Sequence, residues 1–182
     1  MAAHSTGRID GDAGPATLLA FDRALPPLVL ITEPPDSSDN IPDAGDAKLT
    51  GVHNSLVAVI RLASLRSAIP FTVPEGLRTK ARQAALVKAG ASKTQNSRHL
   101  TGHAVDLWPL DPQTMKPIPS GAAFPKGSSE ARAADARLWA DLRQVAVAVK
   151  SAAKELGVVM EHGVDWGWDA PHHQLNRAAY PA

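Results

Sequence analysis

Residues 97–106 read Ser97-Arg98-His99-Leu100-Thr101-Gly102-His103-Ala104-Val105-Asp106. This stretch places His99 and Asp106 seven residues apart, with Gly102 between them. Because glycine permits a tight turn, the chain can bring both side chains to one point, as a metal site requires. The alternative is that Asp106 pairs with a nearby arginine and that His99 is a surface loop residue. The spacing alone leaves both interpretations open.

A second cluster near the C-terminus favours the metal site. It reads Asp169-Ala170-Pro171-His172-His173 and adds a histidine ligand together with a spare carboxylate. Pro171 stiffens the approach to His172, which helps to hold a ligand in place. A catalytic zinc ion takes three protein ligands, keeps one position open for water and works beside a base. The two clusters therefore predict a zinc peptidase site with the ligands His99, Asp106 and His172 and with Asp169 as the base.

The composition is that of a compact globular domain. The chain has 182 residues, a formal net charge of +1 and no cysteine. This length gives room for one domain with a full core, and the small net charge argues against a dedicated nucleic-acid-binding protein. The lack of cysteine excludes disulfides and thiolate metal sites. No stretch is long and apolar enough to span a membrane, and residues 1–5 lack the basic start of a signal peptide.

We expect an N-terminal extension followed by one domain. Residues 33–47 are rich in proline, serine, aspartate and glycine, a composition typical of a linker. Before them, residues 11–21 resemble the closing part of a peptidoglycan-binding repeat, in which an Asp-Gly turn precedes a Gly-Pro-x-Thr helix. We therefore divide the chain into an extension at residues 1–46, with a partial cell-wall-binding remnant, and a catalytic domain at residues 47–182.

The apolar pattern from residue 48 onward predicts an α+β fold. Three helices are expected: one that Asn54 caps and Pro70 ends, one from Thr79 through Lys88 that Gly90 closes, and a long one whose apolar face comprises Leu138, Leu142, Val145, Val149 and Leu156. The strand candidates are residues 71–73, 104–108, 158–160 and 172–175, and residues 109–128 are expected to form a long surface loop. This order indicates a small antiparallel sheet flanked by helices.

The combined motifs resemble those of a known family. The pattern Ser-x-His, six residues, then Asp, with a distal Asp-x-Pro-His, is similar to the signature of the D-alanyl-D-alanine carboxypeptidase-like (LAS-type) zinc metallopeptidases. Within that family the chain most resembles the L-alanyl-D-glutamate endopeptidases of phage endolysins. The matching stretches are residues 49–53, 75–79, 90–94, 97–106, 154–157 and onward to 174–175, so the resemblance covers about residues 48–182. It implies the LAS/hedgehog-type zinc peptidase fold.

The resemblance also implies roles for individual residues. His99, Asp106 and His172 match the zinc ligands of the family, and Asp169 matches its catalytic carboxylate. Arg78 matches an arginine that steadies the charge developing on the scissile carbonyl and so contacts the substrate. A fixed donor of this kind is typically worth roughly 2.7–4 kcal/mol in the transition state. The alternative for Arg78 is a structural salt bridge.

For three residues near these positions the sequence leaves two possible roles open. Ser97 either hydrogen-bonds the substrate or caps the loop that presents His99. Asp165 rivals Asp169 as the base, because the loop before the last motif is a few residues shorter than the family pattern. His173 rivals His172 as the ligand, although alternation along a strand lets only one of the two face the metal.

The other polar and aromatic residues near the motifs are expected to be structural. We expect His103 and His162 to support the site or lie at the surface, and Gln83 to lie on a helix surface. Of the three tryptophans near the motifs, at least two are expected to pack in the core rather than line a groove; they are Trp108, Trp166 and Trp168.

The expected function is that of an endolysin-like peptidoglycan hydrolase, which cuts the L-Ala–D-Glu bond of the stem peptide with zinc-activated water. A D-Ala-D-Ala carboxypeptidase or dipeptidase would use the same metal site, and a non-catalytic cell-wall-binding module would share the fold. The expected cofactor is Zn²⁺, although the same ligands accept other divalent ions. The expected partner is bacterial peptidoglycan, with no nucleic acid and no membrane insertion, and the chain is expected to be a monomer. Without an export signal, it would be made in the host cytoplasm and reach the periplasmic cell wall after holin-type release.

Overall fold

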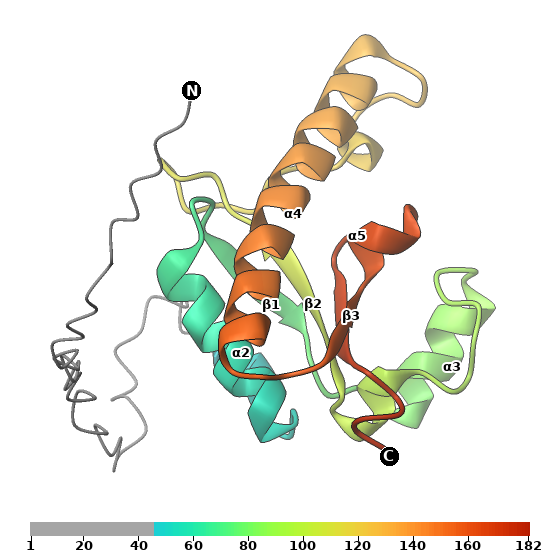
Figure 1. Ribbon diagram of the computed structural model, residues 1–182. Helices are drawn as coiled ribbons and strands as arrows, with labels where there is room; N and C mark the ends of the chain where they lie inside the picture. The colour runs from blue at the N-terminus through green and yellow to red at the C-terminus, as the bar shows by residue number, and fades with distance from the viewer. Residues whose placement is uncertain (1–45) are drawn as a thin grey trace, which may run out of the picture. The chain divides into compact units, whose positions relative to one another are not determined.

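A computed structural model describes residues 46–182 of the chain (Figure 1). The helices are α2 (Asn54–Arg66), α3 (Lys80–Lys88), α4 (Ser129–Glu155) and α5 (Gly163–Trp166), and the strands are β1 (Phe71–Glu75), β2 (Ala104–Pro109), β3 (Met160–His162) and β4 (His172–Leu175). Three short 3-10 helices complete the order: η1 (Ala47–Leu49), η2 (Arg98–Thr101) and η3 (Gly121–Ala123). The predicted extension at residues 1–46 lies almost wholly outside the described residues, so the predicted domain division stays a prediction.

The four strands form one antiparallel sheet in the order β1-β2-β4-β3. In this sheet Asp106 of β2 pairs with Glu75 of β1 on one side and with His172 of β4 on the other. His173 pairs in turn with His162 of β3. The register therefore places Asp106 and His172 directly opposite each other on the two central strands.

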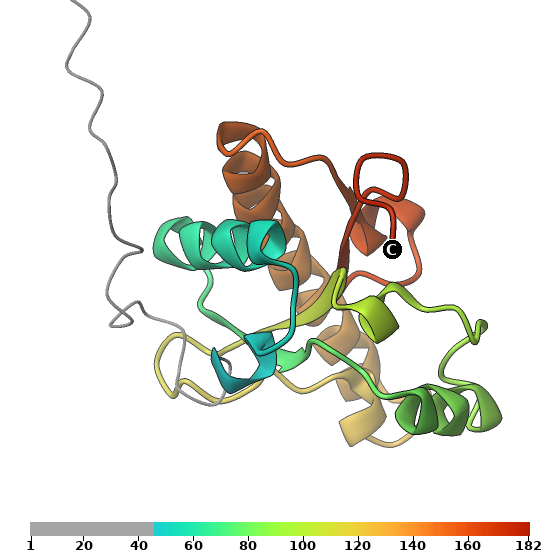
Figure 2. The same cartoon turned by 90° about the horizontal axis from the view of Figure 1, so that it is seen from below.

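The main core lies between the sheet and the helices α2 and α4, which lie side by side (Figures 1 and 2). Its buried members include Leu56, Val59 and Ile60 of α2, Val145, Val149 and Ala152 of α4, and Phe71, Val73, Val105, Leu107 and Leu175 of the strands. Side chains alternate between the two faces of a strand. Because Val105 and Leu175 enter this core, Asp106 and His172 point to the opposite face of the sheet.

The predicted fold class is confirmed. The predicted residues at the start and the end of α3 also have their expected roles. The side chain of Thr79 caps α3 by accepting the backbone N–H of Arg82. Gly90 follows the end of α3 with φ +74°, in the left-handed region that glycine tolerates best. The four predicted strands are all present, and residues 110–120 form a surface loop that continues into η3.

Other boundaries differ from the prediction. His53, not Asn54, caps α2, because His53 Nδ1 accepts the N–H of Ser55 at 3.2 Å, and α2 ends at Arg66, before Pro70. β3 begins two residues later than expected. Leu156 lies just beyond α4 and is 44% exposed, so it is not part of the apolar face.

A membrane-spanning helix is not found in the described part of the chain, where every helix is too short or too polar to cross a bilayer.

Candidate functional site

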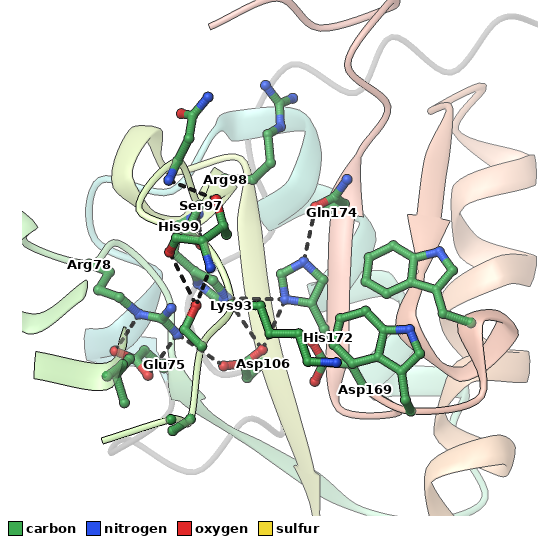
Figure 3. A pocket seen from close by; sticks show the side chains of 18 of the residues that line it. Glu75, Arg78, Lys93, Ser97, Arg98, His99, Asp106, Asp169, His172 and Gln174 are labelled. Atoms are coloured by element: carbon green, nitrogen blue, oxygen red, sulfur yellow. Dashed lines mark hydrogen bonds and ion pairs between the residues drawn. The ribbon is translucent and has the colours of Figure 1, made fainter. Parts of the chain in front are cut away.

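Three side chains converge on the sheet face that α2 and α4 leave uncovered (Figure 3). His99 comes from η2, Asp106 from β2 and His172 from β4. His99 Nε2 lies 3.2 Å from His172 Nδ1 and 3.3 Å from Asp106 Oδ1, and the distance from His172 Nδ1 to Asp106 Oδ1 is 3.2 Å. The three atoms form a nearly equilateral triangle. The structure thus brings together the three residues that the sequence predicted as metal ligands.

This triangle has the size of one face of a tetrahedral zinc site. Zinc–nitrogen and zinc–oxygen bonds of about 2.0–2.1 Å separate neighbouring ligand atoms by about 3.3–3.4 Å in a tetrahedron. The donor types also fit, because zinc accepts imidazole nitrogen and carboxylate oxygen. His99, Asp106 and His172 could therefore hold a divalent cation.

Hydrogen bonds on the far side of each ring fix which nitrogen carries the proton. His99 Nδ1 lies 2.8 Å from the carbonyl oxygen of Gly76, which can only accept, so Nδ1 carries the proton. His172 Nε2 lies 3.0 Å from Gln174 Oε1, and the amide of Gln174 is oriented by its own donation to Glu161 at 2.7 Å. When the rings are neutral, the lone pairs of His99 Nε2 and His172 Nδ1 would therefore face each other, an arrangement that a cation between them would stabilise.

The electrostatics keep Asp106 ionised. Burial alone would raise the pKa of the Asp106 carboxyl, but hydrogen bonds with His172 and His99 hold it well below its usual range. Burial also disfavours a charge on His172, yet the hydrogen bond to Asp106 and its negative charge raise the pKa of His172 above the ordinary value. At neutral pH Asp106 is therefore an anion, as a metal ligand must be.

Arg78 lies beside Asp106, one of the predicted metal ligands, and is buried. Its guanidinium donates to Glu75 through Nε at 2.8 Å and Nη2 at 2.9 Å, and to Gln83 through Nη1 at 2.7 Å. Nη2 also lies 3.4 Å from Asp106 Oδ2. A guanidinium has five N–H donors, and these contacts use four of them. One N–H on Nη1 is therefore not used by Glu75, Gln83 or Asp106. The structural salt bridge is therefore present, and a single donor remains for a substrate.

The local sequence explains how His99 and Asp106 meet. Ser97 caps η2, with its Oγ accepting the N–H of His99 at 3.4 Å, and Gly102 ends η2 at φ +70°. A Cβ on Gly102 would lie 2.2 Å from the carbonyl oxygen of Gly51, so the turn has no room for a side chain. The capping role of Ser97 is thus present. Its predicted contact with substrate stays a prediction, although Ser97 lines the pocket.

Asp169 lines the same pocket as the three predicted metal ligands. Burial is the main influence on its carboxyl group and raises the pKa of Asp169 above its ordinary value. Asp165, the rival base, is not among the residues that line this pocket. Its carboxylate lies 2.6 Å from Lys150 Nζ of α4.

The pocket is an open cavity of about 550 Å³. Trp166 and Trp168 stand at its edge with stacked rings 5.6 Å apart, and Trp168 is 62% exposed. Trp108 is half-buried and donates from Nε1 to the carbonyl of Ile118 at 2.8 Å. The expectation that at least two of the three tryptophans pack in the core is wrong, because α5 and the turn at Gly167 hold two of them at the surface.

Gln83 has a place in the site that its sequence context did not indicate. This side chain is fully buried rather than on a helix surface: it accepts from Arg78, and its Nε2 donates to Ser92 Oγ at 2.8 Å and to the carbonyl of Thr94. Its neighbours on α3 are mostly exposed, so helical periodicity offered no sign of burial. The one available signal was its position one turn after the Thr79 cap, near Arg78.

The other histidines of residues 46–182 lie outside the triangle. His173 is fully buried on the opposite sheet face from His172, as alternation predicted, and its Nδ1 lies 2.9 Å from His162 Nδ1. Burial lowers the pKa of His162 to about 4 and that of His173 to about 3, so both rings are neutral at pH 7. His103 packs against the ring of His53, with the ring centroids 5.1 Å apart.

Comparison with known proteins points to one family. The family described as phage L-alanyl-D-glutamate peptidase matches residues 40–117. The L-alanyl-D-glutamate peptidase of Escherichia phage T5 is 29% identical over 142 residues, which cover 74% of this chain and 88% of that protein. The crystal structure of the Serratia marcescens L-Ala D-Glu endopeptidase ChiX is 42% identical and superposes with a TM-score of 0.62, covering 77% of this chain and 92% of that one. The family predicted from the motifs is thereby confirmed: this chain belongs to the L-alanyl-D-glutamate peptidases.

Proposed function

We propose that this chain is a peptidoglycan hydrolase that cleaves the L-Ala–D-Glu bond of the stem peptide. The observation that carries the proposal is the convergence of His99, Asp106 and His172 on a pocket that Asp169 also lines. The choice of bond is supported by the two relatives, both of which are named for it.

The three ligands are proposed to hold Zn²⁺. When bound, zinc would supply a Lewis acid that makes water more acidic and polarises a peptide carbonyl. His99 and His172 offer imidazole nitrogens, and the other ring nitrogen of each is held by Gly76 and Gln174. Such supporting bonds typically change metal affinity or activity by about 10–100-fold when they are removed.

Asp169 is proposed to move the protons. Its carboxylate would take a proton from the attacking water and then deliver a proton to the leaving amine of D-Glu. Burial raises the pKa of Asp169, and this brings the carboxylate closer to the basicity that proton transfer near neutral pH requires. Asp165 is a poorer candidate because Lys150 already pairs with it.

Arg78 is proposed to act in two ways. Its contacts with Glu75 and Asp106 position the ligand carboxylate, and its remaining Nη1 donor would stabilise the oxyanion that forms on the L-Ala carbonyl. Replacing Arg78 by lysine separates the two roles, because lysine keeps the charge and loses the fork of donors. If Arg78→Lys keeps metal affinity and loses kcat, the oxyanion role is supported; a loss of metal affinity alone would support positioning.

The experiment that tests the proposed function is mass spectrometry of the products released from purified Gram-negative peptidoglycan. We expect stem peptides that begin at D-Glu, with L-Ala left on the glycan, and a loss of activity with a chelator that added Zn²⁺ restores. The His172→Ala variant serves as the inactive control. Release of D-Ala alone would support the carboxypeptidase alternative, and binding without products would support a non-catalytic module.

The predicted monomer and the predicted release by a holin are parts of this proposal that need separate tests. Light scattering on the purified chain measures the first. Lysis of cells that express the chain with and without a holin measures the second.

A further inference from the structure

The pocket contains a cation that the chemistry described so far does not use. Lys93 lies in the exposed loop between α3 and η2, and its Nζ lies 5.3 Å from the ring centroid of Trp168, which follows α5. Figure 3 shows Lys93 extending across the pocket toward the side that carries Asp169 and His172. Its ammonium group therefore lies in the pocket between the loop that carries Lys93 and the segment that carries Trp168.

The other cations that line the pocket are already engaged. Arg78 is held by Glu75, Gln83 and Asp106. Arg98 is buried and donates to the carbonyls of Leu175 and Tyr180. Arg177 donates to the carbonyl of Asn96 at 3.4 Å. Within residues 46–182, Lys93 forms no ion pair, and its ammonium group lies over the ring of Trp168.

The loop that carries Lys93 is anchored to the site. The buried side chain of Gln83 donates to Ser92 and to Thr94, the two residues that flank Lys93, and accepts from Arg78. One amide therefore ties both neighbours of Lys93 to the guanidinium that contacts the ligand Asp106. This anchoring distinguishes Lys93 from an ordinary surface lysine, because its backbone position is fixed relative to the site.

The substrate of the proposed function carries a charge that needs such a partner. In the stem peptide D-Glu continues through its γ-carboxyl, so its α-carboxylate is free and lies about 2.5 Å from the nitrogen of the cut bond. This anion would enter a pocket that already holds the carboxylates of Asp106 and Asp169, whose charge the proposed Zn²⁺ would offset. A cation directly beside the substrate carboxylate would add a charge-assisted partner that recognises this group.

We propose that Lys93 forms an anion-binding subsite for the free α-carboxylate of the D-Glu residue at the cut bond. The inference rests on the proposed function and extends it to the recognition of one charged group. When the carboxylate binds, the ammonium group of Lys93 either moves away from the ring of Trp168 or contacts the ring and the carboxylate together. Lys93 is thus a determinant of specificity for the acid over the corresponding amide.

The test compares two synthetic N-acetylmuramoyl tripeptides of one sequence, in which the α-carboxyl of the γ-linked D-Glu is either free or converted to the amide. We expect the wild type to prefer the acid by about tenfold in kcat/KM, as for a charge-assisted hydrogen bond. Lys93→Met is expected to abolish this preference through KM, whereas Lys93→Arg keeps it. The matched control is Lys88→Met, which removes the same charge from the exposed end of α3, outside the pocket, and is expected to keep the wild-type preference.

Each other outcome overturns the inference. A wild type that cuts acid and amide equally, a Lys93→Met variant that keeps the preference, or a loss of preference in Arg177→Met instead would each exclude Lys93 as the subsite. An equal loss of both activities in Lys93→Met would show a structural role for this residue. If the wild type cuts neither peptide nor intact peptidoglycan, the proposed function itself fails.

Discussion

Asp169 and Asp165 lie four residues apart, yet their carboxylates have different surroundings. Asp169 faces the pocket and is acted on by the charges of His172 and Asp106 at a distance, whereas Asp165 is exposed and paired with Lys150. We expect Asp169→Asn to keep bound metal and to lose roughly 10²–10⁴-fold in kcat, because the amide cannot accept a proton. Metal analysis and steady-state kinetics on the same preparation measure both quantities.

The matched control is Asp165→Asn, which makes the same chemical change outside the pocket. It is expected to keep near-wild-type kcat, because only an exposed ion pair is lost. A large loss of kcat in Asp165→Asn together with an active Asp169→Asn would reverse the assignment of the base.

Gln83 is a buried amide that joins Arg78 to the loop at residues 92–94. Its replacement by alanine would remove the acceptor of Arg78 Nη1 and the donor to the carbonyl of Thr94 and to Ser92 Oγ. We expect Gln83→Ala to lower the free energy of unfolding by about 1–3 kcal/mol, the usual cost of leaving buried polar groups unpaired. Urea denaturation of the metal-free protein measures this change.

The control for this prediction is Gln144→Ala on α4, where the glutamine is exposed. It is expected to change the free energy of unfolding by no more than about 0.5 kcal/mol. Equal effects of the two substitutions would show that the contacts of Gln83 add no stability.

At the scale of elements, the short helix α5 sets the position of the strand that follows it. A Cβ on Gly163, at the start of α5, would lie 1.8 Å from the carbonyl oxygen of Asp169. That same carbonyl accepts the N–H of His172 at 3.0 Å in the turn that leads into β4. We expect Gly163→Ala to displace this turn and to weaken zinc binding by about 10–100-fold, the range typical of disturbed support around a ligand. A competitive zinc titration with a chromophoric chelator measures the affinity.

The control is Gly157→Ala, at a position with φ +65° and open space around a Cβ. It is expected to cost about 1–2 kcal/mol of stability, because the left-handed backbone is strained for alanine, and to leave zinc affinity unchanged. If the two variants bind zinc equally well, the close approach at Gly163 does not govern the site.

The elements that the sequence predicted are those with a local signal. Apolar residues recur at helical spacing in α2 and α4, and the turn at Gly102 is visible in the motif that joins His99 to Asp106. Alternation along β4 also places His172 and His173 on opposite faces of the sheet from the sequence alone. Motif and strand register together therefore suffice to place the predicted metal ligands on one face.

What the sequence did not reveal depends on contacts between distant segments. α5 has only four residues, too few for a helical period, and its place is set by packing against the turn at Asp169. The cap of α2 is a histidine, a residue type that is uncommon at this position. Gln83 is buried because the loop at residues 92–94 folds over it, and no pattern within α3 records this contact.

At the scale of the whole molecule, the two faces of the sheet respond differently to acid. The uncovered face carries the charged groups of the site, whereas the covered face carries the neutral pair His162 and His173 beneath α4. Burial lowers the pKa of His162 to about 4, with the charge of Lys150 adding to the effect, and burial lowers that of His173 to about 3. Unfolding would return both rings to water, where the ordinary value for histidine is about 6.5.

The unfolded chain therefore binds more protons than the native protein at mildly acid pH. The stability that comes from keeping these rings neutral is fully present above about pH 6.5 and is lost as the pH falls through about 4. For His162 alone the difference corresponds to on the order of 3 kcal/mol. We expect His162→Asn, which cannot titrate, to reduce the slope of unfolding free energy against pH between pH 6.5 and 5 by about one proton. Urea unfolding of both proteins in a chelator measures this slope without protons taken up on metal release, and equal slopes would mean that His162 is protonated in the native state as easily as in water.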